Sequence, residues 1–247
     1  MIKYIILGIV QGLTEFLPVS SSGHLVILEK LFGITDNQLA ITVILHLGTA
    51  CALVVYFFKD LLKLFRNLAL LALLGTTTVI TIVIAVLGND FFESLFSSVL
   101  PIAFALLVTG IILLSTKKFM QGVRSEIRFK DAVILGLTQS IAIIPGISRS
   151  GITISTLLFR GIERQKCFYY SFLAAIPVIF GAALFSARKI DFILKAERLN
   201  LSIGFLASFL TGLFSLWALK LIMRKAKLHY FGYYCIALAL IILLFMR

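Results

Sequence analysis

Six apolar runs of about 20 residues constrain the fold of this chain more than any other feature, because an apolar α-helix of that length matches the thickness of a bilayer. Only 14% of the residues are charged, whereas a soluble domain carries roughly 25%. We therefore expect an all-α polytopic membrane protein that forms one integral membrane domain over residues 1–247. The six predicted spans are residues 39–58, 68–88, 98–115, 167–187, 201–223 and 230–246.

Two further apolar regions are interrupted by proline, glycine and hydroxyl residues. Within them, GIVQGLTEFLPVSSSG (8–23) aligns with GLTQSIAIIPGISRSG (136–151) at an offset of 128 residues, and the same offset carries the first three spans close to the last three. A duplicated unit explains this agreement, with a chance match as the alternative. The matched pairs are Gly8/Gly136, Gln11/Gln139, Ser20/Ser148, Ser22/Ser150 and Gly23/Gly151.

The duplication predicts a topology. If each broken segment enters and leaves the membrane on one side, each repeat crosses three times and the second repeat is inverted. We expect two inverted repeats, about 1–115 and 129–246, each a re-entrant broken-helix segment followed by three transmembrane helices. This makes six full spans plus two re-entrant hairpins. Broken helices meet near the midplane, where protein must satisfy their backbone, so the two hydroxyl clusters should face each other.

The basic residues predict the orientation. About twice as many Lys and Arg residues fall on one predicted side of the membrane as on the other, and the richer side is usually cytoplasmic. Both termini should then lie outside. The same bias accounts for the formal net charge of +12, so no nucleic-acid partner is expected. The richer side comprises residues 59–67, 117–130, 160–166 and 224–229.

Glu15 is an acid in an otherwise apolar segment. A carboxylate beside Leu13 and Phe16 needs a cavity or a partner, so we interpret it as functional. Gln11 lies four residues earlier and therefore on the same helical face. The alternative is that Glu15 pairs with a basic residue only to stabilise packing.

A hydroxyl cluster follows Glu15, after Pro18, which should end the helix. Serines before a helix are usual N-caps, so capping is the alternative role for any one of them. Three consecutive serines exceed what one cap requires. A helix start with spare donors binds anions, and glycine lets the backbone approach the anion closely. The cluster comprises Ser20, Ser21, Ser22 and Gly23.

The three histidines receive different interpretations. His24 follows the serine cluster and could share a pocket with Glu15 across the helix break, with a structural role as the alternative. His46 could line the same cavity, but we favour a packing role for it because it lies within a span. His229, at the end of a span, is expected at the membrane interface.

The second broken region contains Arg149, the only charged residue from Ala132 to Phe159. A guanidinium in the membrane needs an anion, and its fork fits phosphate bidentately. Its alternative partner is Glu15, and the two could alternate if substrate phosphate displaces the acid. The two clusters together suit a lipid that carries phosphate. The other predicted phosphate-binding residues of this region are Gly146, Ser148, Ser150 and Thr153.

QGLTEFLPVSSSGHL (11–25) and PGISRSGIT (145–153) resemble the two signature motifs of the undecaprenyl-diphosphate phosphatase family, which is known for bacitracin resistance. The resemblance extends over the whole chain, including HLGTA (46–50). It implies a multi-pass enzyme of the bacterial cytoplasmic membrane that removes the terminal phosphate of undecaprenyl diphosphate and so recycles the cell-wall lipid carrier. The substrate is thus a polyprenyl diphosphate lipid among membrane lipids, and a homodimer is left open.

The resemblance also implies site residues. Arg149 would hold the diphosphate, and Ser21 would attack the terminal phosphorus or orient a water. His24 would act as general acid or base. Glu15 would bind a divalent cation, Mg²⁺ or Ca²⁺, or activate the nucleophile. The family motif has Glu or Gln four residues before the essential Glu, and this chain has Gln11 there. The resemblance also implies Ser20 as an active-site position and Ser148 and Ser150 as phosphate ligands. All predicted substrate-binding residues together are Gln11, Ser20, Ser22, Gly23, Gly146, Ser148, Ser150 and Thr153.

A transporter or flippase of a phosphorylated lipid or small anion is the alternative function, because inverted repeats with broken helices are also transporter architecture. Phosphate release by the purified protein in detergent distinguishes the two, since transport needs two compartments. A purely structural scaffold leaves Glu15 and Arg149 unexplained.

Overall fold

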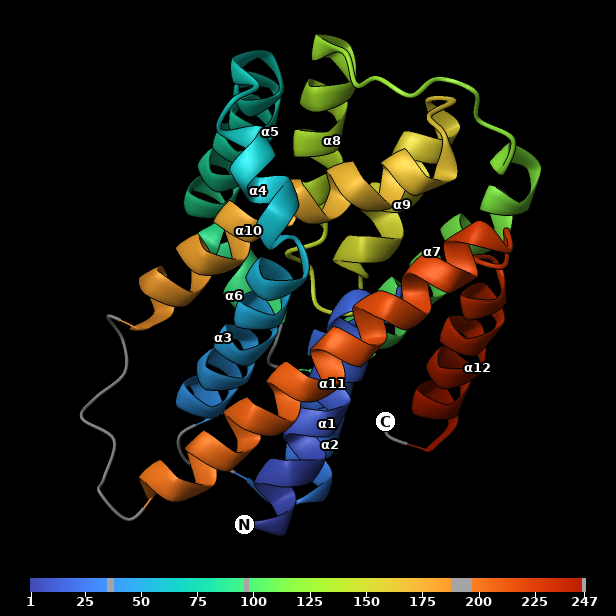
Figure 1. The fold of residues 1–247 in the computed structure, drawn as a ribbon. Helices are drawn as coiled ribbons and strands as arrows, with labels where there is room; N and C mark the ends of the chain where they lie inside the picture. The colour runs from blue at the N-terminus through green and yellow to red at the C-terminus, as the bar shows by residue number, and fades with distance from the viewer. Residues whose placement is uncertain (35–37, 96–97, 188–196, 246–247) are drawn as a thin grey trace.

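The computed structural model describes residues 1–34, 38–95, 98–187 and 197–245, and within these ranges the chain is helical, with no strand (Figure 1). Helix formation follows from the apolar runs, since a helix satisfies all backbone polar groups within one segment. The α-helices are α1 (Ile2–Phe16), α2 (Ser21–Leu31), α3 (Gln38–Tyr56), α4 (Phe58–Leu64), α5 (Leu68–Leu87), α6 (Asn89–Ser94), α7 (Val99–Ser115), α8 (Phe129–Ile141), α9 (Arg149–Phe159), α10 (Arg164–Ala187), α11 (Arg198–Arg224) and α12 (Tyr230–Phe245).

Among the described residues, five helices are long and apolar enough to cross a membrane. They are α3, α5, α7 with the 3₁₀ turn Thr116–Phe119 that follows it, α10 and α11. They coincide with five of the six predicted spans, which confirms the prediction of an all-α polytopic membrane protein. The sixth, α12, has 16 residues. At about 1.5 Å per residue it is shorter than the roughly 30 Å of a bilayer core.

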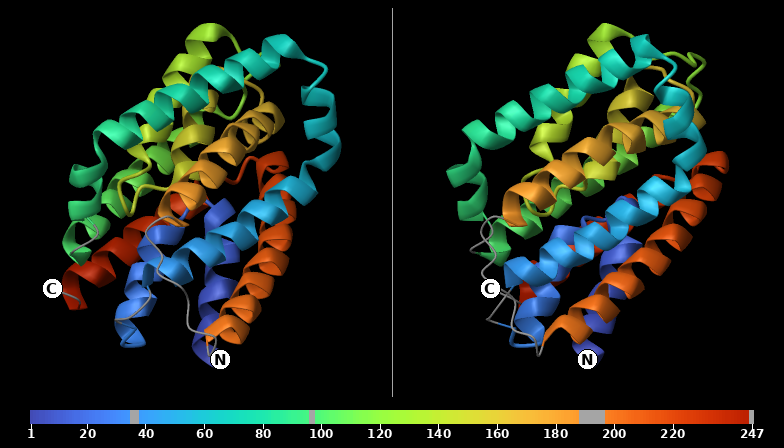
Figure 2. Two further views of the ribbon diagram at one scale, coloured as in Figure 1. Left: turned by 90° about the vertical axis from the view of Figure 1, so that its left-hand side faces the viewer. Right: turned by 60° about the vertical axis from the view of Figure 1, so that its left-hand side comes forward.

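Each interrupted region forms a pair of helices with a break at its proline. α1 ends before Pro18 and α2 begins at Ser21, while α8 ends before Pro145 and α9 begins at Arg149. In Figure 1, α1 and α2 extend inward from the end that carries the N-terminus, and α8 begins at the opposite end. The views in Figure 2 agree with this arrangement. The two breaks therefore point toward each other inside the molecule.

Small and hydroxyl residues let the broken pairs pack closely on long helices. α1 lies against α11, and α8 lies against α5. At Gly12 of α1, an added Cβ would lie 2.0 Å from Thr211 Oγ1, so only glycine fits. On α5, Thr77 and Thr81 donate to the carbonyls of Ala132 and Gly136 at 2.9 and 3.2 Å. Such contacts drive helix association where lipid is as apolar as the helix surface.

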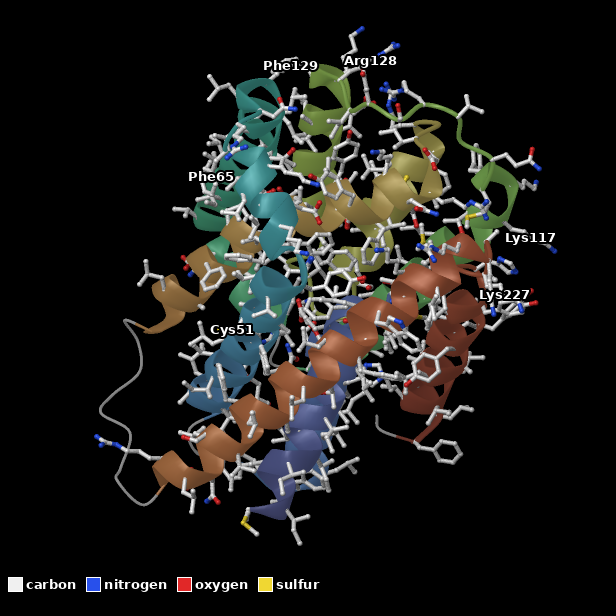
Figure 3. The ribbon with its side chains drawn as sticks, in the orientation of Figure 1. Cys51, Phe65, Lys117, Arg128, Phe129 and Lys227 are labelled. Atoms are coloured by element: carbon white, nitrogen blue, oxygen red, sulfur yellow. The ribbon has the colours of Figure 1, made fainter. Side chains whose placement is uncertain are left out.

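The basic segments gather at one end of the molecule, where Figure 3 labels Lys117, Arg128 and Lys227. Backbone hydrogen bonds join segments 117–130 and 160–166. The Arg124 N–H donates to the Gly161 carbonyl, and the Glu163 N–H donates to the Arg124 carbonyl. At the other end, Lys3 donates to the carbonyl of Phe32, and Tyr4 donates to Glu197. The basic residues Arg188, Lys189, Lys195 and Arg247, which fall on the predicted side with fewer basic residues, lie outside the described residues.

Candidate active site

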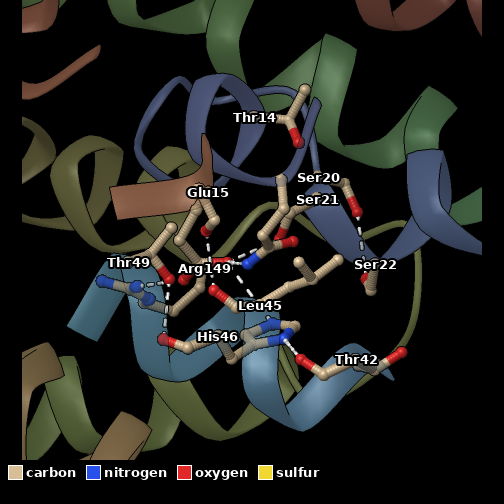
Figure 4. Close-up of polar contacts among 12 residues, drawn as sticks. Thr14, Glu15, Ser20, Ser21, Ser22, Thr42, Leu45, His46, Thr49 and Arg149 are labelled. Carbon is tan, nitrogen blue, oxygen red and sulfur yellow. Dashed lines mark hydrogen bonds and ion pairs between the residues drawn. The ribbon is translucent and has the colours of Figure 1, made fainter. Parts of the chain in front are cut away.

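Glu15 lies at the end of α1, where the chain leaves the helix before Pro18, and only 9% of the residue is exposed. Three donors surround its carboxylate (Figure 4). Ser21 Oγ donates to Oε2 at 2.6 Å, and Gln11 Nε2 donates to the same oxygen at 3.1 Å. Arg149 Nη2 donates to Oε1 at 2.7 Å. The buried charge is therefore paired and hydrogen-bonded, as a buried charge must be.

Ser20 and Ser21 have different roles at the start of α2. Ser20 is the N-cap, because its Oγ accepts from Gly23 N–H at 3.4 Å. Its backbone has a φ of +67°, a strained value for a residue with a side chain. This backbone conformation turns the chain into α2, whose first residue, Ser21, donates a hydrogen bond to Glu15. Ser22 Oγ lies 3.3 Å from Ser20 Oγ.

The start of α9 repeats this arrangement. Ser148 caps the helix by accepting from Gly151 N–H at 3.2 Å, and its Oγ lies 3.3 Å from Ser150 Oγ. Gly146 has a φ of +98°, and an added Cβ there would lie 2.5 Å from the carbonyl oxygen of Ile102, so this turn requires glycine.

Thr153 is not a free donor at this helix start. Its Oγ1 donates to the Arg149 carbonyl at 2.7 Å and lies 2.7 Å from Ser171 Oγ. The structure therefore engages Thr153 in the contact between α9 and α10. It does not place this hydroxyl beside Glu15 as it does Ser21.

The two helix starts lie in contact. A Cβ added to Gly23 would lie 3.7 Å from the Cα of Gly146, and one added to Gly151 would lie 3.3 Å from Pro18 Cβ. We call the place where the two helix breaks meet, around Pro18, Gly23, Gly146 and Gly151, the junction. The two serine clusters lie on either side of it. The Glu15–Arg149 ion pair crosses the same junction.

Arg149 has a free donor. Nη2 bonds Glu15, and the guanidinium carbon lies 5.8 Å from the centre of the Phe172 ring. Nη1 is buried and has no hydrogen-bond partner among the described residues. A buried, unpaired guanidinium nitrogen costs free energy until an acceptor reaches it. An anion that enters the junction would supply that acceptor.

His24 contacts α12. Its Nδ1 lies 2.7 Å from the carbonyl oxygen of Ser20 and its Nε2 lies 2.7 Å from Tyr234 Oη. Because a carbonyl only accepts, Nδ1 carries the hydrogen and Nε2 accepts from the Tyr234 hydroxyl. Tyr234 is not among the predicted site residues, because nothing in the apolar run 230–246 distinguishes it from its neighbours.

His46 lies next to Glu15, although its position within a span favoured a packing role. Its Nε2 is 3.5 Å from Glu15 Oε2, and its Nδ1 is 2.8 Å from the carbonyl oxygen of Thr42. The rotation of α3 about its axis, set by packing against α10 and α11, turns this side chain inward. His229 lies just before α12, at the end of a span as expected.

Glu15 and Gln11 carry the oxygen atoms of this site that could contact a hard divalent cation. Gln11 Oε1 is buried and lacks a partner among the described residues. Amide and carboxylate oxygens are ligands of Mg²⁺ and Ca²⁺, and Mg²⁺ is commonly bound by one or two carboxylates plus substrate phosphates. No group of three or more His, Cys, Asp or Glu side chains able to hold a metal occurs in the described part of the chain. Phosphate oxygens would have to complete the shell.

The chain is similar to known proteins over almost its whole length. A family model described as bacitracin resistance protein BacA matches residues 4–241. Proteins named undecaprenyl-diphosphatase are 41% identical in Halothermothrix orenii (98% of this chain, 96% of that protein) and 38% identical in Methanococcus maripaludis strain C5 (98% and 99%). Another protein of this name, from Thermosipho africanus, is 41% identical and covers 97% of this chain and 98% of its own length.

Proposed function

The chain belongs to the bacitracin resistance protein family, and we propose that it hydrolyses undecaprenyl diphosphate to undecaprenyl phosphate and inorganic phosphate. The relatives named undecaprenyl-diphosphatase align with nearly the full chain. The reaction would recycle the cell-wall lipid carrier and confer resistance to bacitracin. The polyprenyl chain of such a substrate would stay in the bilayer beside the apolar helices. Its diphosphate would enter the junction between the two broken pairs.

The unpaired terminal nitrogen of the Arg149 guanidinium is the observation that carries this proposal. One of its terminal nitrogens holds Glu15, and the other is buried without a partner among the described residues. A diphosphate would satisfy the free nitrogen and would then compete with Glu15 for the fork, which fits phosphate oxygens bidentately. Backbone N–H groups at the starts of α2 and α9 add positive potential on both sides.

Ser21 and Glu15 are arranged for nucleophilic attack. Ser21 Oγ attacks the terminal phosphorus, its proton moves to Glu15 Oε2, and the bond from that phosphorus to the bridging oxygen breaks. Undecaprenyl phosphate leaves, and a water then hydrolyses the phosphoserine and releases inorganic phosphate. If Ser21 instead orients the water, Glu15 takes the proton of that water and no phosphoserine forms. Most of the rate comes from positioning and charge neutralisation.

The remaining predicted residues act around this step. His24 serves as general acid or base, and its ring is positioned by Ser20 and Tyr234. The Ser20 and Ser148 caps hold the helix starts, and Ser22, Ser150, Gly23 and Gly146 shape the junction. A divalent cation, Mg²⁺ or Ca²⁺, held by Glu15 and Gln11, would neutralise charge on the phosphates.

We also propose that the fold is an inverted repeat with two re-entrant segments, set in the cytoplasmic membrane with both termini outside. The first helix of each proposed repeat packs on a long helix of the other repeat, since α1 packs on α11 and α8 packs on α5. The caps Ser20 and Ser148 occupy matched positions at the starts of α2 and α9. The concentration of basic segments at one end supports a cytoplasmic assignment for that end.

Phosphate release from a C55 polyprenyl diphosphate by detergent-purified protein tests the activity. We expect Arg149→Ala to lower turnover by about 10²–10³-fold, as the loss of one charge-stabilising donor does elsewhere. Arg66→Ala is the matched control, because Arg66 is exposed at the basic end, and it should keep wild-type turnover. Turnover by Arg149→Ala near the wild-type rate would contradict the assignment. Full activity of Ser21→Ala would remove the covalent route only.

A further inference from the structure

Phe172 of α10 lies against Arg149 and has no part in the proposed reaction. The guanidinium carbon of Arg149 is 5.8 Å from the centre of the Phe172 ring, and Phe172 is 0% exposed. An arginine within about 6 Å of the centre of an aromatic ring is attracted by the negative face of that ring. The attraction is stronger away from water, and the Arg149 side chain is only 14% exposed.

The hydrogen bonds of Arg149 do not by themselves fix its guanidinium. Nη2 donates to Glu15 at 2.7 Å, while Nη1 is buried and has no hydrogen-bond partner among the described residues. A single hydrogen bond fixes one nitrogen of this planar group but not the orientation of its plane. A ring against the guanidinium restricts that orientation and offsets part of the cost of the unpaired nitrogen.

Other aromatic rings hold Phe172 itself in place. The centre of its ring lies 4.9 to 6.3 Å from those of Phe16, Phe57 and Phe168. Aromatic pairs at these separations stabilise one another in edge-to-face and offset arrangements. Phe16 directly follows Glu15 in the chain. The aromatic cluster therefore adjoins both residues of the Glu15–Arg149 ion pair.

A second contact joins α10 to the same helix start. Ser171 Oγ lies 2.7 Å from Thr153 Oγ1, and Thr153 Oγ1 donates to the Arg149 carbonyl at 2.7 Å. This contact accounts for Thr153, whose hydroxyl the proposed reaction does not use. Ser171 thus acts on the backbone of Arg149 through Thr153, while the next residue of α10, Phe172, contacts the Arg149 side chain.

We propose that Phe172 is a positioning residue for Arg149, and that the face of its ring holds the guanidinium at the angle at which the fork meets the diphosphate. The inference rests on the proposed function for the identity of that anion. The ring contact does not depend on Glu15, so it keeps the guanidinium plane in place when phosphate oxygens replace the carboxylate. Loss of this contact should lower kcat/KM by roughly 2–30-fold.

Fluorinated phenylalanines at position 172 test this directly. Each fluorine withdraws electrons from the ring and weakens its negative face, while the shape of the side chain changes little. Mono-, di- and trifluorophenylalanine are introduced at position 172 and, as the matched control, at position 168. Phe168 is also buried and belongs to the same aromatic cluster. Among the described residues, no cation lies over its ring.

We expect kcat/KM for phosphate release from a C55 polyprenyl diphosphate to fall stepwise with each fluorine at position 172, and to show no such trend at position 168. The total fall at position 172 should be roughly 2–30-fold. Equal trends at the two positions would show that Phe172 acts only through packing and would overturn the proposal. An unchanged kcat/KM throughout the series at position 172 would overturn it as well.

Thermal unfolding in detergent separates this inference from the proposed function. The fluorine series at position 172 should lower the Tm stepwise in the wild-type background but not in Arg149→Gln, which removes the cation. The same trend in both backgrounds, or at position 168, would refute the contact. Wild-type protein that releases no phosphate would refute the proposed function, and the Tm series would still decide whether Phe172 holds Arg149. The comparison with position 168 needs no Arg149 variant to fold.

Discussion

At the scale of single residues, Glu15 receives hydrogen-bond donors from both halves of the chain. Ser21 and Arg149 occupy matched positions at the offset of 128, and both donate to Glu15. The position that matches Glu15 itself holds Ile143. The two matched segments therefore share one carboxylate, with a hydroxyl on one side and a guanidinium on the other. Under the proposed function, this asymmetry would let one helix start supply a nucleophile while the other binds phosphate.

Removal of the Tyr234 hydroxyl should impair His24 without unfolding the site. Tyr234 donates to His24 Nε2, and the two rings stack with centroids 5.8 Å apart. Tyr234→Phe keeps the stacking and loses the hydrogen bond, which is worth about 0.5–1.5 kcal/mol. We expect a fall in turnover of roughly 2–10-fold with little change in KM. Tyr233→Phe, an exposed neighbour, is the control, and an equal loss in both variants would refute a specific role for Tyr234.

At the scale of helices, close packing of the broken pairs holds the site together. α1 positions Glu15 and Gln11 only because its glycines let it lie directly on α11. The same principle operates on the other side, where threonines of α5 bond the carbonyls of α8. Both broken pairs are thus fixed by a long apolar helix of the opposite half. A change at these contacts should disturb stability before it disturbs chemistry.

Gly12→Ala should destabilise the protein, because its Cβ would meet Thr211 Oγ1 at 2.0 Å and the Ser208 carbonyl oxygen at 2.5 Å. Overpacking of this kind costs about 1–3 kcal/mol. Gly75→Ala on α5 is the matched control, since its Cβ would meet nothing within 4 Å and alanine favours the helix. Thermal unfolding in detergent should show a lower Tm for Gly12→Ala and an equal or higher Tm for Gly75→Ala. Equal Tm values for wild type and Gly12→Ala would contradict this packing.

Asp131, outside the five candidate spans, connects the start of α8 to the basic segments 117–130 and 160–166 by hydrogen bonds. It accepts from Arg124 at 2.5 Å and from Arg160 at 2.8 Å. Burial raises the pKa of the Asp131 carboxyl, but these bonds outweigh burial and lower the pKa from 3.8 to about 2. Because the folded pKa is depressed, the carboxylate stabilises the fold above about pH 4, and this contribution is lost as pH falls toward 2.

We therefore expect Asp131→Asn to lower the Tm at neutral pH, and the gap from wild type to narrow as pH falls from about 4 to about 2. Thermal unfolding across that range measures the gap. Asp90→Asn, at an exposed acid of α6, is the control and should match wild type throughout. A gap for Asp131→Asn that stays constant over the pH range would show that the charge of Asp131 does not contribute.

At the scale of the whole molecule, the two ends differ in charge and should face different compartments. In a variant with Cys51, Cys167 and Cys235 replaced, Lys30→Cys and Gln121→Cys place single thiols at exposed positions of opposite ends. We expect a membrane-impermeant maleimide to label Lys30→Cys in intact cells and Gln121→Cys only after permeabilisation. The reverse pattern would invert the proposed orientation. Labelling of both thiols in intact cells would contradict a membrane between the two ends.

The sequence by itself determined the elements. Apolar run length predicts where helices form because the bilayer sets that length, and the prolines at 18 and 145 predict the breaks because proline cannot continue a helix. The repeated pattern predicted that two serine clusters would be related, and Glu15 and Arg149 were found because charge in an apolar segment needs a partner.

Only the tertiary structure decided which side chains meet. Ser20 caps a helix while Ser21 reaches Glu15, and the choice depends on the φ of Ser20. His46 and Tyr234 reach the two halves of the site from α3 and α12, many residues away along the chain. Sequence periodicity relates neighbours three or four positions apart on one helix. The rotation of one helix against another depends on the packing of all their side chains together, and no short stretch of sequence contains that information.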